Sequence, residues 1–362
     1  MYLSIKDFQS AFRQSGFRCP IVLISESAAD RYGIKEDLLH SVEQKAMVWV
    51  SRIDANPTPD TVLAALQALH AGKNDGVIAI GGGSAIDLAK TVSAFRGLAL
   101  SSYDEVVACI DRKAYGNNRA NALPILAVPT TSGTGSEVTQ WATIWDYQNN
   151  KKYSVDAHWL RPAATWYVPE LMLTQPVGQT LSTGLDAVCH AVEGYWSQKS
   201  DPLVRELAVS SVRLFVAHLR PTLDNPTSLP LREKLCTASA LAGLAFSTTR
   251  TTACHSISYP LTYLHGINHG FAVAMTLAEV ANYNRRKVDL SPLLLEFEPY
   301  GGMCAWLDGV CDGIVKLRLS GFGVSTSALD RIVEGAFTGG RMDNNPVDLT
   351  TRDVYDILTR VL

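Results

Sequence analysis

The most informative segment of the chain reads Gly76-Val-Ile-Ala-Ile80-Gly-Gly-Gly-Ser84-Ala-Ile-Asp87-Leu-Ala-Lys90. An apolar run, three glycines and a segment with helical spacing predict a strand, a tight turn and the start of a helix. Glycines let phosphate oxygens approach the backbone, and the first N–H groups of the helix attract an anion. The stretch is neither Gly-x-Gly-x-x-Gly nor a P-loop. It therefore predicts either a pyrophosphate site or a tight connection without a ligand.

Further apolar runs surround this stretch, and they predict a parallel sheet. They cover residues 21–24, 47–50 and 123–128, with segments of helical spacing between them. The last run ends at Pro129 and continues into a loop rich in glycine and hydroxyl groups, residues 130–136. This loop is expected at the carboxyl edge of the sheet, beside the glycine turn. Residues 141–155 are expected to form a hairpin.

The second half of the chain is predicted to be helical. Apolar residues recur there at three- and four-residue spacing over residues 180–197, 202–218, 229–246, 270–283, 325–336 and 350–362. The last two segments begin with candidate hydroxyl caps. We therefore expect an α/β domain over residues 1–168 and an all-α domain over residues 169–362.

Composition restricts the class of function. The 362 residues carry 32 Lys and Arg against 35 Asp and Glu, for a net charge of −3. These charges are interspersed, so we expect neither a nucleic-acid partner nor a membrane surface as partner. The seven cysteines form no Cys-x-x-Cys pair, and no leader or apolar run of spanning length is evident. The expected protein is cytoplasmic and acts on a small molecule.

Four residues in the helical half have the chemistry of metal ligands. Asp186 and His190 lie at i and i+4, on one helical face, and His255 and His269 follow. Fourteen residues of straight helix would separate the last two by about 21 Å, so a break at Pro260 and Gly266 is needed. One carboxylate and three imidazoles suit Fe(II) or Zn(II). The alternative is hydrogen-bonded histidines without an ion.

Glu26 follows the first predicted strand. An acidic side chain there can hydrogen-bond a ribose and repel a 2′-phosphate, which favours NAD(H) over NADP(H). The alternative is an exposed glutamate at the start of a helix.

Four motifs occur in the order Gly-Gly-Gly-Ser-x-x-Asp, Thr-Thr-x-Gly-Thr, Asp-x3-His and His-x13-His-Gly. With them the chain resembles the iron-containing (group III) alcohol dehydrogenases. The resemblance implies a Rossmann-like N-terminal domain and a helical C-terminal domain, the dehydroquinate synthase-like fold, and a metal-dependent alcohol or aldehyde oxidoreductase. It implies the metal ligands Asp186, His190, His255 and His269, and the cofactor-binding residues Gly82, Gly83, Ser84, Asp87, Thr130, Gly133, Thr134 and Lys152.

The chain departs from the family pattern at Tyr259, where members commonly carry a histidine that relays a proton. Candidate proton donors are then Tyr259, His265 or solvent. A second departure is Val168, where many members carry an aspartate at the domain boundary.

Residues 250–262 and the ending 340–349 resemble the phosphonoacetaldehyde reductase branch of the family. The resemblance implies reduction of 2-phosphonoacetaldehyde to 2-hydroxyethylphosphonate. Arg250 and Arg341 are the expected phosphonate ligands, because guanidinium groups match its oxygens. Alternatives are a general short-chain alcohol dehydrogenase, a non-redox lyase like dehydroquinate synthase, and a cofactor-binding module without activity. A homodimer or larger homo-oligomer is expected.

Overall fold

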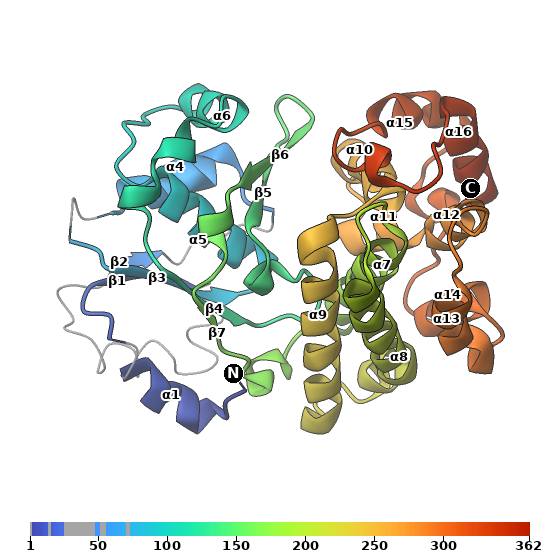
Figure 1. Cartoon of the computed structure of the whole chain (residues 1–362), viewed down its shortest axis with the longest axis horizontal. Coiled ribbons are helices and arrows are strands. Elements are labelled where there is room, and N and C mark those ends of the chain that lie inside the picture. The colour runs from blue at the N-terminus through green and yellow to red at the C-terminus, as the bar shows by residue number, and fades with distance from the viewer. Residues whose placement is uncertain (1, 14–15, 25–47, 51–55, 70–72) are drawn as a thin grey trace. The chain divides into compact units, whose positions relative to one another are not determined.

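The computed structural model describes residues 2–13, 16–24, 48–50, 56–69 and 73–362. The chain divides into two compact units. The first comprises Met1–Thr131 and Ser136–Leu173, and the second comprises Ser132–Gly135 and Thr174–Leu362. The first is built on a parallel sheet and the second is helical, which confirms the predicted fold class (Figure 1).

The first unit contains a parallel sheet in the order β2-β1-β3-β4-β7. Its strands are β1 (Pro20–Ile24), β2 (Val48–Val50), β3 (Gly76–Gly81), β4 (Ile125–Pro129) and β7 (Ala164–Thr165). Gly81 pairs with Pro129, so the segments that follow β3 and β4 leave the sheet at the same edge. The parallel sheet and its carboxyl-edge loop were both predicted from the apolar runs. The two-residue strand β7 is too short to give a sequence signal.

Both faces of this sheet are covered, which explains the continuous apolar runs. Ile21 and Leu23 of β1 belong to one apolar cluster, whereas Val22 and Ile24 belong to another. Helix α5 (Gly83–Phe95) packs its apolar residues in the first of these clusters. The other α-helices and strands described in this unit are α1 (Ile5–Arg13), α4 (Pro59–Gln67), α6 (Tyr103–Asp111) and the predicted hairpin of β5 (Trp141–Asp146) and β6 (Lys151–Asp156).

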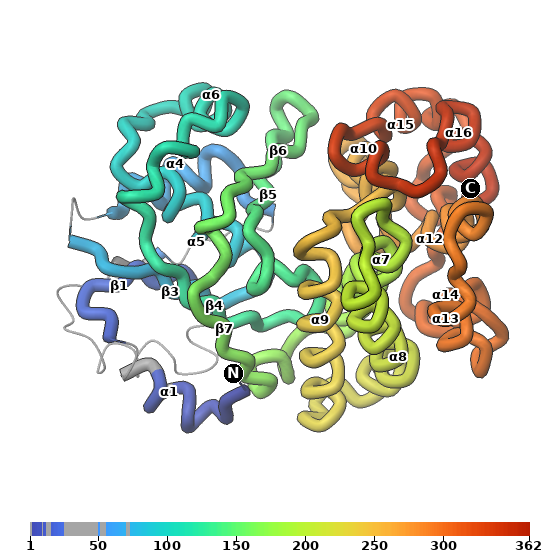
Figure 2. Tube along the Cα trace, viewed as in Figure 1, coloured from blue at the N-terminus to red at the C-terminus, as the bar shows by residue number. Residues whose placement is uncertain are grey.

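The second unit is a bundle of helices. Three long ones run side by side, as the chain trace in Figure 2 shows: α7 (Val177–Trp196), α8 (Pro202–Asp224) and α9 (Leu229–Thr249). The others are α10 (Ala253–His265), α11 (His269–Ala274), α12 (Leu277–Asn284), α13 (Ser291–Leu294), α14 (Met303–Cys311), α15 (Leu329–Gly335) and α16 (Thr351–Arg360). No helix in the described ranges is both long and apolar enough to cross a membrane.

The prediction of one helix over residues 270–283 was wrong. The segment forms α11 and α12, which are separated by a turn at Met275 and Thr276. The predicted break at Pro260 was also wrong, since this proline lies inside α10. Gly266 alone ends that helix, in a left-handed conformation with φ of 66°.

Helix ends also differ from the predictions. The helix expected over residues 202–218 continues to Asp224 and includes Pro221 in its last turn. Ser325 caps no helix with its side chain, whereas the Thr350 hydroxyl caps α16 as predicted, and it does so in a capping box with Asp353.

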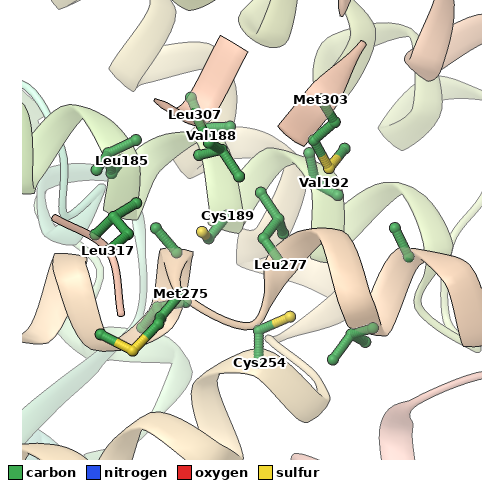
Figure 3. Packing of buried hydrophobic residues seen from close by; sticks show 14 of the residues in the cluster. Leu185, Val188, Cys189, Val192, Cys254, Met275, Leu277, Met303, Leu307 and Leu317 are labelled. Carbon is green, nitrogen blue, oxygen red and sulfur yellow. The ribbon is translucent and has the colours of Figure 1, made fainter. Parts of the chain in front are cut away.

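Helix α7 has two faces with different tasks. Leu185, Val188, Cys189 and Val192 are fully buried on one face and pack against residues such as Leu277 of α12 (Figure 3). Each buried leucine or valine side chain of this face contributes about 1.5–3 kcal/mol. This packing fixes the rotation of α7 about its axis and therefore the direction of its polar residues.

Candidate metal centre and cofactor turn

Three predicted metal ligands lie around one carboxylate oxygen in the helical unit. The Oδ1 atom of Asp186 lies 3.3 Å from Nε2 of His255, 3.7 Å from Nε2 of His190 and 4.0 Å from Nε2 of His269. Candidate ligand atoms of Asp186, His255 and His269 all lie within 4.8 Å of one another. The structure thus brings together residues from α7, α10 and α11.

These groups fit a divalent cation. The Oδ1 atom of Asp186 and the Nε2 atom of His255 are buried, and neither has a hydrogen-bond partner within the described part of the chain. Buried polar atoms normally have partners, so a shared ion is the simplest way to satisfy both. Burial raises the pKa of Asp186, but His190 and the other histidines lower it by more, so that the net pKa of this carboxyl is well below its usual range. Burial lowers the pKa of His190 to about 4. A charged carboxylate and a neutral imidazole are the forms that bind metals.

Glu193, a buried carboxylate beside the candidate ligands, was not predicted from the sequence. It follows Asp186 by seven positions on the same helix and is fully buried. Its Oε2 accepts a hydrogen bond from Nδ1 of His255. Its Oε1 accepts from the backbone N–H groups of Cys254 at 2.8 Å and Thr252 at 3.2 Å, at the start of α10. The carboxylate therefore both caps α10 and orients the His255 ring.

The electrostatics of this pair favour a charged glutamate. Burial raises the pKa of Glu193, but His255 and the N–H donors lower it more, so the net shift is downward. Burial lowers the pKa of His255, but Glu193 raises it more, to about 9. With Nδ1–H held by Glu193, the Nε2 atom of His255 faces Asp186. The spacing of Asp186, His190 and Glu193 at i, i+4 and i+7 was the available signal.

His269 owes its place to the glycine after it. His269 is the first residue of α11. A Cβ atom on Gly270 would lie 2.0 Å from the backbone oxygen of Ser182 in α7. Only glycine therefore lets α11 approach α7 this closely. Asn268 caps α11 and accepts a hydrogen bond from the hydroxyl of Ser182.

The glycine turn of the first unit forms as predicted. Gly82 is the N-cap of α5 and provides no side-chain cap, so the first N–H groups of this helix are available to an anion. A Cβ atom on Gly82 would lie 3.2 Å from Oγ1 of Thr131. The hydroxyl oxygen of Ser84 accepts a hydrogen bond of 3.1 Å from the backbone N–H of Asn56. This turn can hold a pyrophosphate.

Asp87 and Lys90 of α5 anchor the chain that follows β4. Asp87 accepts hydrogen bonds from the Ser136 hydroxyl and from the Thr143 backbone N–H at 2.9 Å. Lys90, fully buried and missed by sequence reasoning, donates to Ser136, to Thr139 and to the backbone oxygen of Trp141. Burial lowers the pKa of Lys90 to about 8. The glycine-turn helix is thereby tied to both ends of the segment 136–143.

The remaining predicted cofactor residues have separate surroundings. Thr130 donates its N–H to Gly81 at 3.0 Å. Gly133 and Thr134 group with the helical unit, where a Cβ on Gly133 would lie 2.5 Å from the backbone oxygen of Thr183. Lys152 lies in β6, with its ammonium 5.9 Å from the ring centroid of Trp145. Glu26 lies outside the described residues.

The structure separates the two candidate proton donors. Tyr259 is buried, and its ring stacks on that of His269 with centroids 6.1 Å apart. His265 is the last residue of α10, about 15 Å along the helix axis from His255. Tyr259 therefore lies beside the candidate ligand His269, whereas His265 lies at the opposite end of α10 from the candidate ligand His255.

The two predicted phosphonate ligands adjoin one loop. Arg250 follows α9, and a Cβ atom on Gly340 would lie 3.6 Å from its Nη1. The neighbouring Arg341 donates from Nη1 to the backbone oxygen of Gly340 at 3.1 Å. Both side chains are partly buried. The structure thus brings the two arginines to the same glycine, although 91 residues separate them in the sequence.

Comparison with known proteins identifies the family. The model of iron-containing alcohol dehydrogenases matches residues 3–167, and that of the C-terminal part of the same family matches residues 180–293. A long-chain-alcohol dehydrogenase of Geobacillus thermodenitrificans is 30% identical over 355 residues, covering 93% of this chain and 88% of that protein. The chain belongs to the iron-containing alcohol dehydrogenase family. It is an enzyme, an NAD-linked alcohol or aldehyde dehydrogenase of the metal-binding type.

Two reductases of anionic aldehydes are also similar to this chain. A phosphonoacetaldehyde reductase of Streptomyces viridochromogenes is 37% identical over 233 residues, covering 64% of this chain and 58% of that protein. A solved structure of sulfoacetaldehyde reductase from Bifidobacterium kashiwanohense in complex with NAD+ superposes with a TM-score of 0.84 at 26% identity. The superposition covers 99% of this chain and 96% of the sulfoacetaldehyde reductase chain.

Proposed function

We propose that this enzyme reduces 2-phosphonoacetaldehyde to 2-hydroxyethylphosphonate with NADH, and catalyses the reverse reaction. The observation that carries the proposal is the approach of the Arg250 and Arg341 side chains to Gly340. Arg250 lies five residues before the candidate metal ligand His255 in the sequence. Two guanidinium groups can bind a phosphonate dianion through charge-assisted hydrogen bonds. The similarity to a phosphonoacetaldehyde reductase supports the same substrate.

Asp186, His190, His255 and His269 are proposed to hold one ion, Fe(II) or Zn(II). When bound, this ion polarises the substrate carbonyl, and NADH supplies the hydride. Glu193 keeps His255 oriented and its ligand atom facing Asp186. His255→Ala and His269→Ala are expected to abolish metal-dependent turnover. Both variants should still bind NADH, as measured by fluorescence titration, because the glycine turn belongs to the other unit. Wild-type turnover in both would contradict the assignment.

Tyr259 is the proposed source of the proton for the product alcohol, at its phenolic oxygen. Its stacking on His269 supports this role over that of His265. Tyr259→Phe keeps the ring and removes the proton, so it should change the pH dependence of aldehyde reduction, whereas His265→Gln should not. Identical pH profiles for wild type and Tyr259→Phe would assign proton delivery to solvent.

NADH is the proposed cofactor, bound by Gly82, Gly83, Ser84, Asp87, Thr130, Gly133, Thr134 and Lys152. Glu26 is proposed to disfavour NADPH by repelling its 2′-phosphate. Glu26→Gly should narrow the ratio of kcat/KM for NADH over NADPH. A wild-type enzyme that prefers NADPH would contradict this proposal.

The substrate is tested with three aldehydes: phosphonoacetaldehyde, sulfoacetaldehyde and propanal. We expect kcat/KM to be highest for phosphonoacetaldehyde. Because hydrogen bonds to a charged group contribute about 1.5–3 kcal/mol, Arg250→Ala and Arg341→Ala should each reduce it by about 10- to 100-fold. Arg352→Ala is the matched control, since that arginine is exposed on α16 and pairs with Asp356. Equal kcat/KM on phosphonoacetaldehyde and propanal would leave only a general alcohol dehydrogenase. Highest efficiency on sulfoacetaldehyde would reassign the anion.

A further inference from the structure

Arg250 has a backbone conformation that normally requires glycine. Its φ is 65° and its ψ is 179°, a region that side chains with a Cβ atom rarely enter. Lys113, another non-glycine residue with positive φ, has ψ of 38° and lies in the ordinary left-handed region. A glycine at position 250 would relieve the strain. The presence of an arginine at this strained position indicates that its side chain has a function.

Asn344 holds this strained residue from both sides. Its Nδ2 donates to the backbone oxygen of Thr249 at 2.8 Å and to that of Thr251 at 3.0 Å. Its Oδ1 accepts from the hydroxyl of Ser197 at 3.1 Å. The Asn344 side chain is buried, so its two N–H bonds are both used on the residues that flank Arg250. An amide supplies two donors and an acceptor, which neither alanine nor aspartate can do.

Asn344 also contacts Arg341, the arginine that is proposed to bind the anion together with Arg250. The backbone N–H of Asn344 donates to the backbone oxygen of Arg341 at 3.0 Å, and Arg341 follows the glycine that Arg250 approaches. Asn344 is therefore bonded to the backbone on both sides of Arg250 and to Arg341 itself. At the other end of the connection, Glu193 holds Thr252 and Cys254 at the start of α10. The segment that carries Arg250 is fixed between two buried side chains.

We infer that Asn344 is a positioning residue that sets the guanidinium of Arg250 beside Arg341, so that both bind the anionic group of the substrate. This inference rests on the proposed function, and it assigns to the asparagine of the Arg341-Met-Asp-Asn344 ending a role in selecting anionic aldehydes over uncharged ones. The amide acts through Arg250 and does not itself contact substrate.

The test measures one quantity, the ratio of kcat/KM for phosphonoacetaldehyde to that for propanal. Asn344→Ala should lower this ratio by about tenfold, the equivalent of one lost charge-assisted hydrogen bond. Asn344→Asp keeps the size but cannot donate to Thr249 and Thr251, so it should lower the ratio as well. It replaces the alanine variant if that variant does not fold. An equal fall on both substrates would mean a merely structural role and would overturn the inference.

Asn345→Ala is the matched control. Asn345 is also buried, and it anchors the same loop through a reciprocal amide pair with Asn284 of α12, at 2.8 and 2.9 Å. It makes none of the hydrogen bonds to Thr249 and Thr251 described for its neighbour. Its loss should lower the melting temperature without changing the substrate ratio. A ratio lowered as much as in Asn344→Ala would show that loop anchoring alone sets selectivity.

A double-mutant cycle separates the inference from the proposed function. Arg250→Gly should keep a melting temperature at or above that of wild type, because glycine adopts this conformation without strain, and it should lower the substrate ratio. In the Arg250→Gly background, Asn344→Ala should lower the ratio no further. If the wild-type enzyme has equal kcat/KM on the two aldehydes, the phosphonate function fails. If the wild type prefers phosphonoacetaldehyde and Arg250→Gly leaves the ratio unchanged, Arg250 does not bind the anion and the inference is overturned. If Arg250→Gly lowers the ratio but Asn344→Ala does not, the function stands and the positioning role is overturned.

Discussion

The Nδ1 atom of His255 and the Oε2 atom of Glu193 are hydrogen-bonded in the interior of the helical unit, although 62 residues separate them in the sequence. Glu193 is completely inaccessible to solvent, and its other oxygen caps the helix that carries His255. The carboxylate therefore determines both where α10 begins and which nitrogen of His255 faces Asp186.

Glu193→Gln should weaken binding of the divalent ion by about 10- to 100-fold, the usual effect of removing a carboxylate behind a ligating histidine. Glutamine keeps the size of the side chain but loses the charge. Titration of Zn(II) or Fe(II) against a competing chelator measures the change. Glu206→Gln, at an exposed position of α8, is the control. Equal metal affinities in wild type and Glu193→Gln would remove the orienting role.

Gly270→Ala should destabilise the protein by about 1–3 kcal/mol, the usual cost of overpacking, and should lower metal affinity. The added methyl group would lie 2.0 Å from the backbone oxygen of Ser182, so α11 must move away and take His269 with it. Chemical denaturation and metal titration measure both effects. Gly178→Ala, where a Cβ meets nothing within 4 Å, should instead stabilise α7 by about 0.5–1 kcal/mol. Unchanged metal binding in Gly270→Ala would count against the role of this close approach.

Gly82→Ala should raise the dissociation constant of NADH by about tenfold, as expected for the loss of one hydrogen bond to a charged group. Its methyl group would lie 3.2 Å from Oγ1 of Thr131, at the N-terminus of α5 where a phosphate would bind. Fluorescence titration measures the constant. Gly116→Ala, with open space around the added carbon, should bind NADH like the wild type. Normal NADH binding by Gly82→Ala would argue for a simple connection without a ligand.

Glu137→Gln should become more stable relative to wild type as pH rises from 5 to 8.5. Burial raises the pKa of Glu137 from 4.5 to about 7, so between these values the folded protein binds a proton that the unfolded chain has released. Wild-type stability due to this group is complete below 4.5 and is lost as pH rises through 7. Glutamine does not titrate, so the difference should grow by about 1–3 kcal/mol. Denaturation at the two pH values measures it, and a difference independent of pH would contradict the prediction.

Much of the fold could be predicted because its signals are local. Glycines 81–83 after an apolar run specify a strand, a turn and a helix start within fifteen residues, and Thr350 with Asp353 specifies a capping box within four. Asp186 and His190 share a helical face by spacing alone. The division of residues 270–283 into two helices has no local signal, because Met275 and Thr276 between them keep right-handed helical angles and neither is a glycine or a proline.

The amino-acid sequence alone was enough to predict the fold class, the family and the residue types of the proposed metal centre and cofactor turn, since periodicity and motif spacing are properties of neighbouring residues. Which of these residues meet depends on how the helices pack. Glu193 finds His255 because α7 and α10 pack together, and Gly270 admits His269 to Asp186 by close contact with α7. Asn344 reaches the residues on both sides of Arg250 across more than ninety positions. Such contacts arise from the packing of side chains between helices, and no spacing along the chain encodes them.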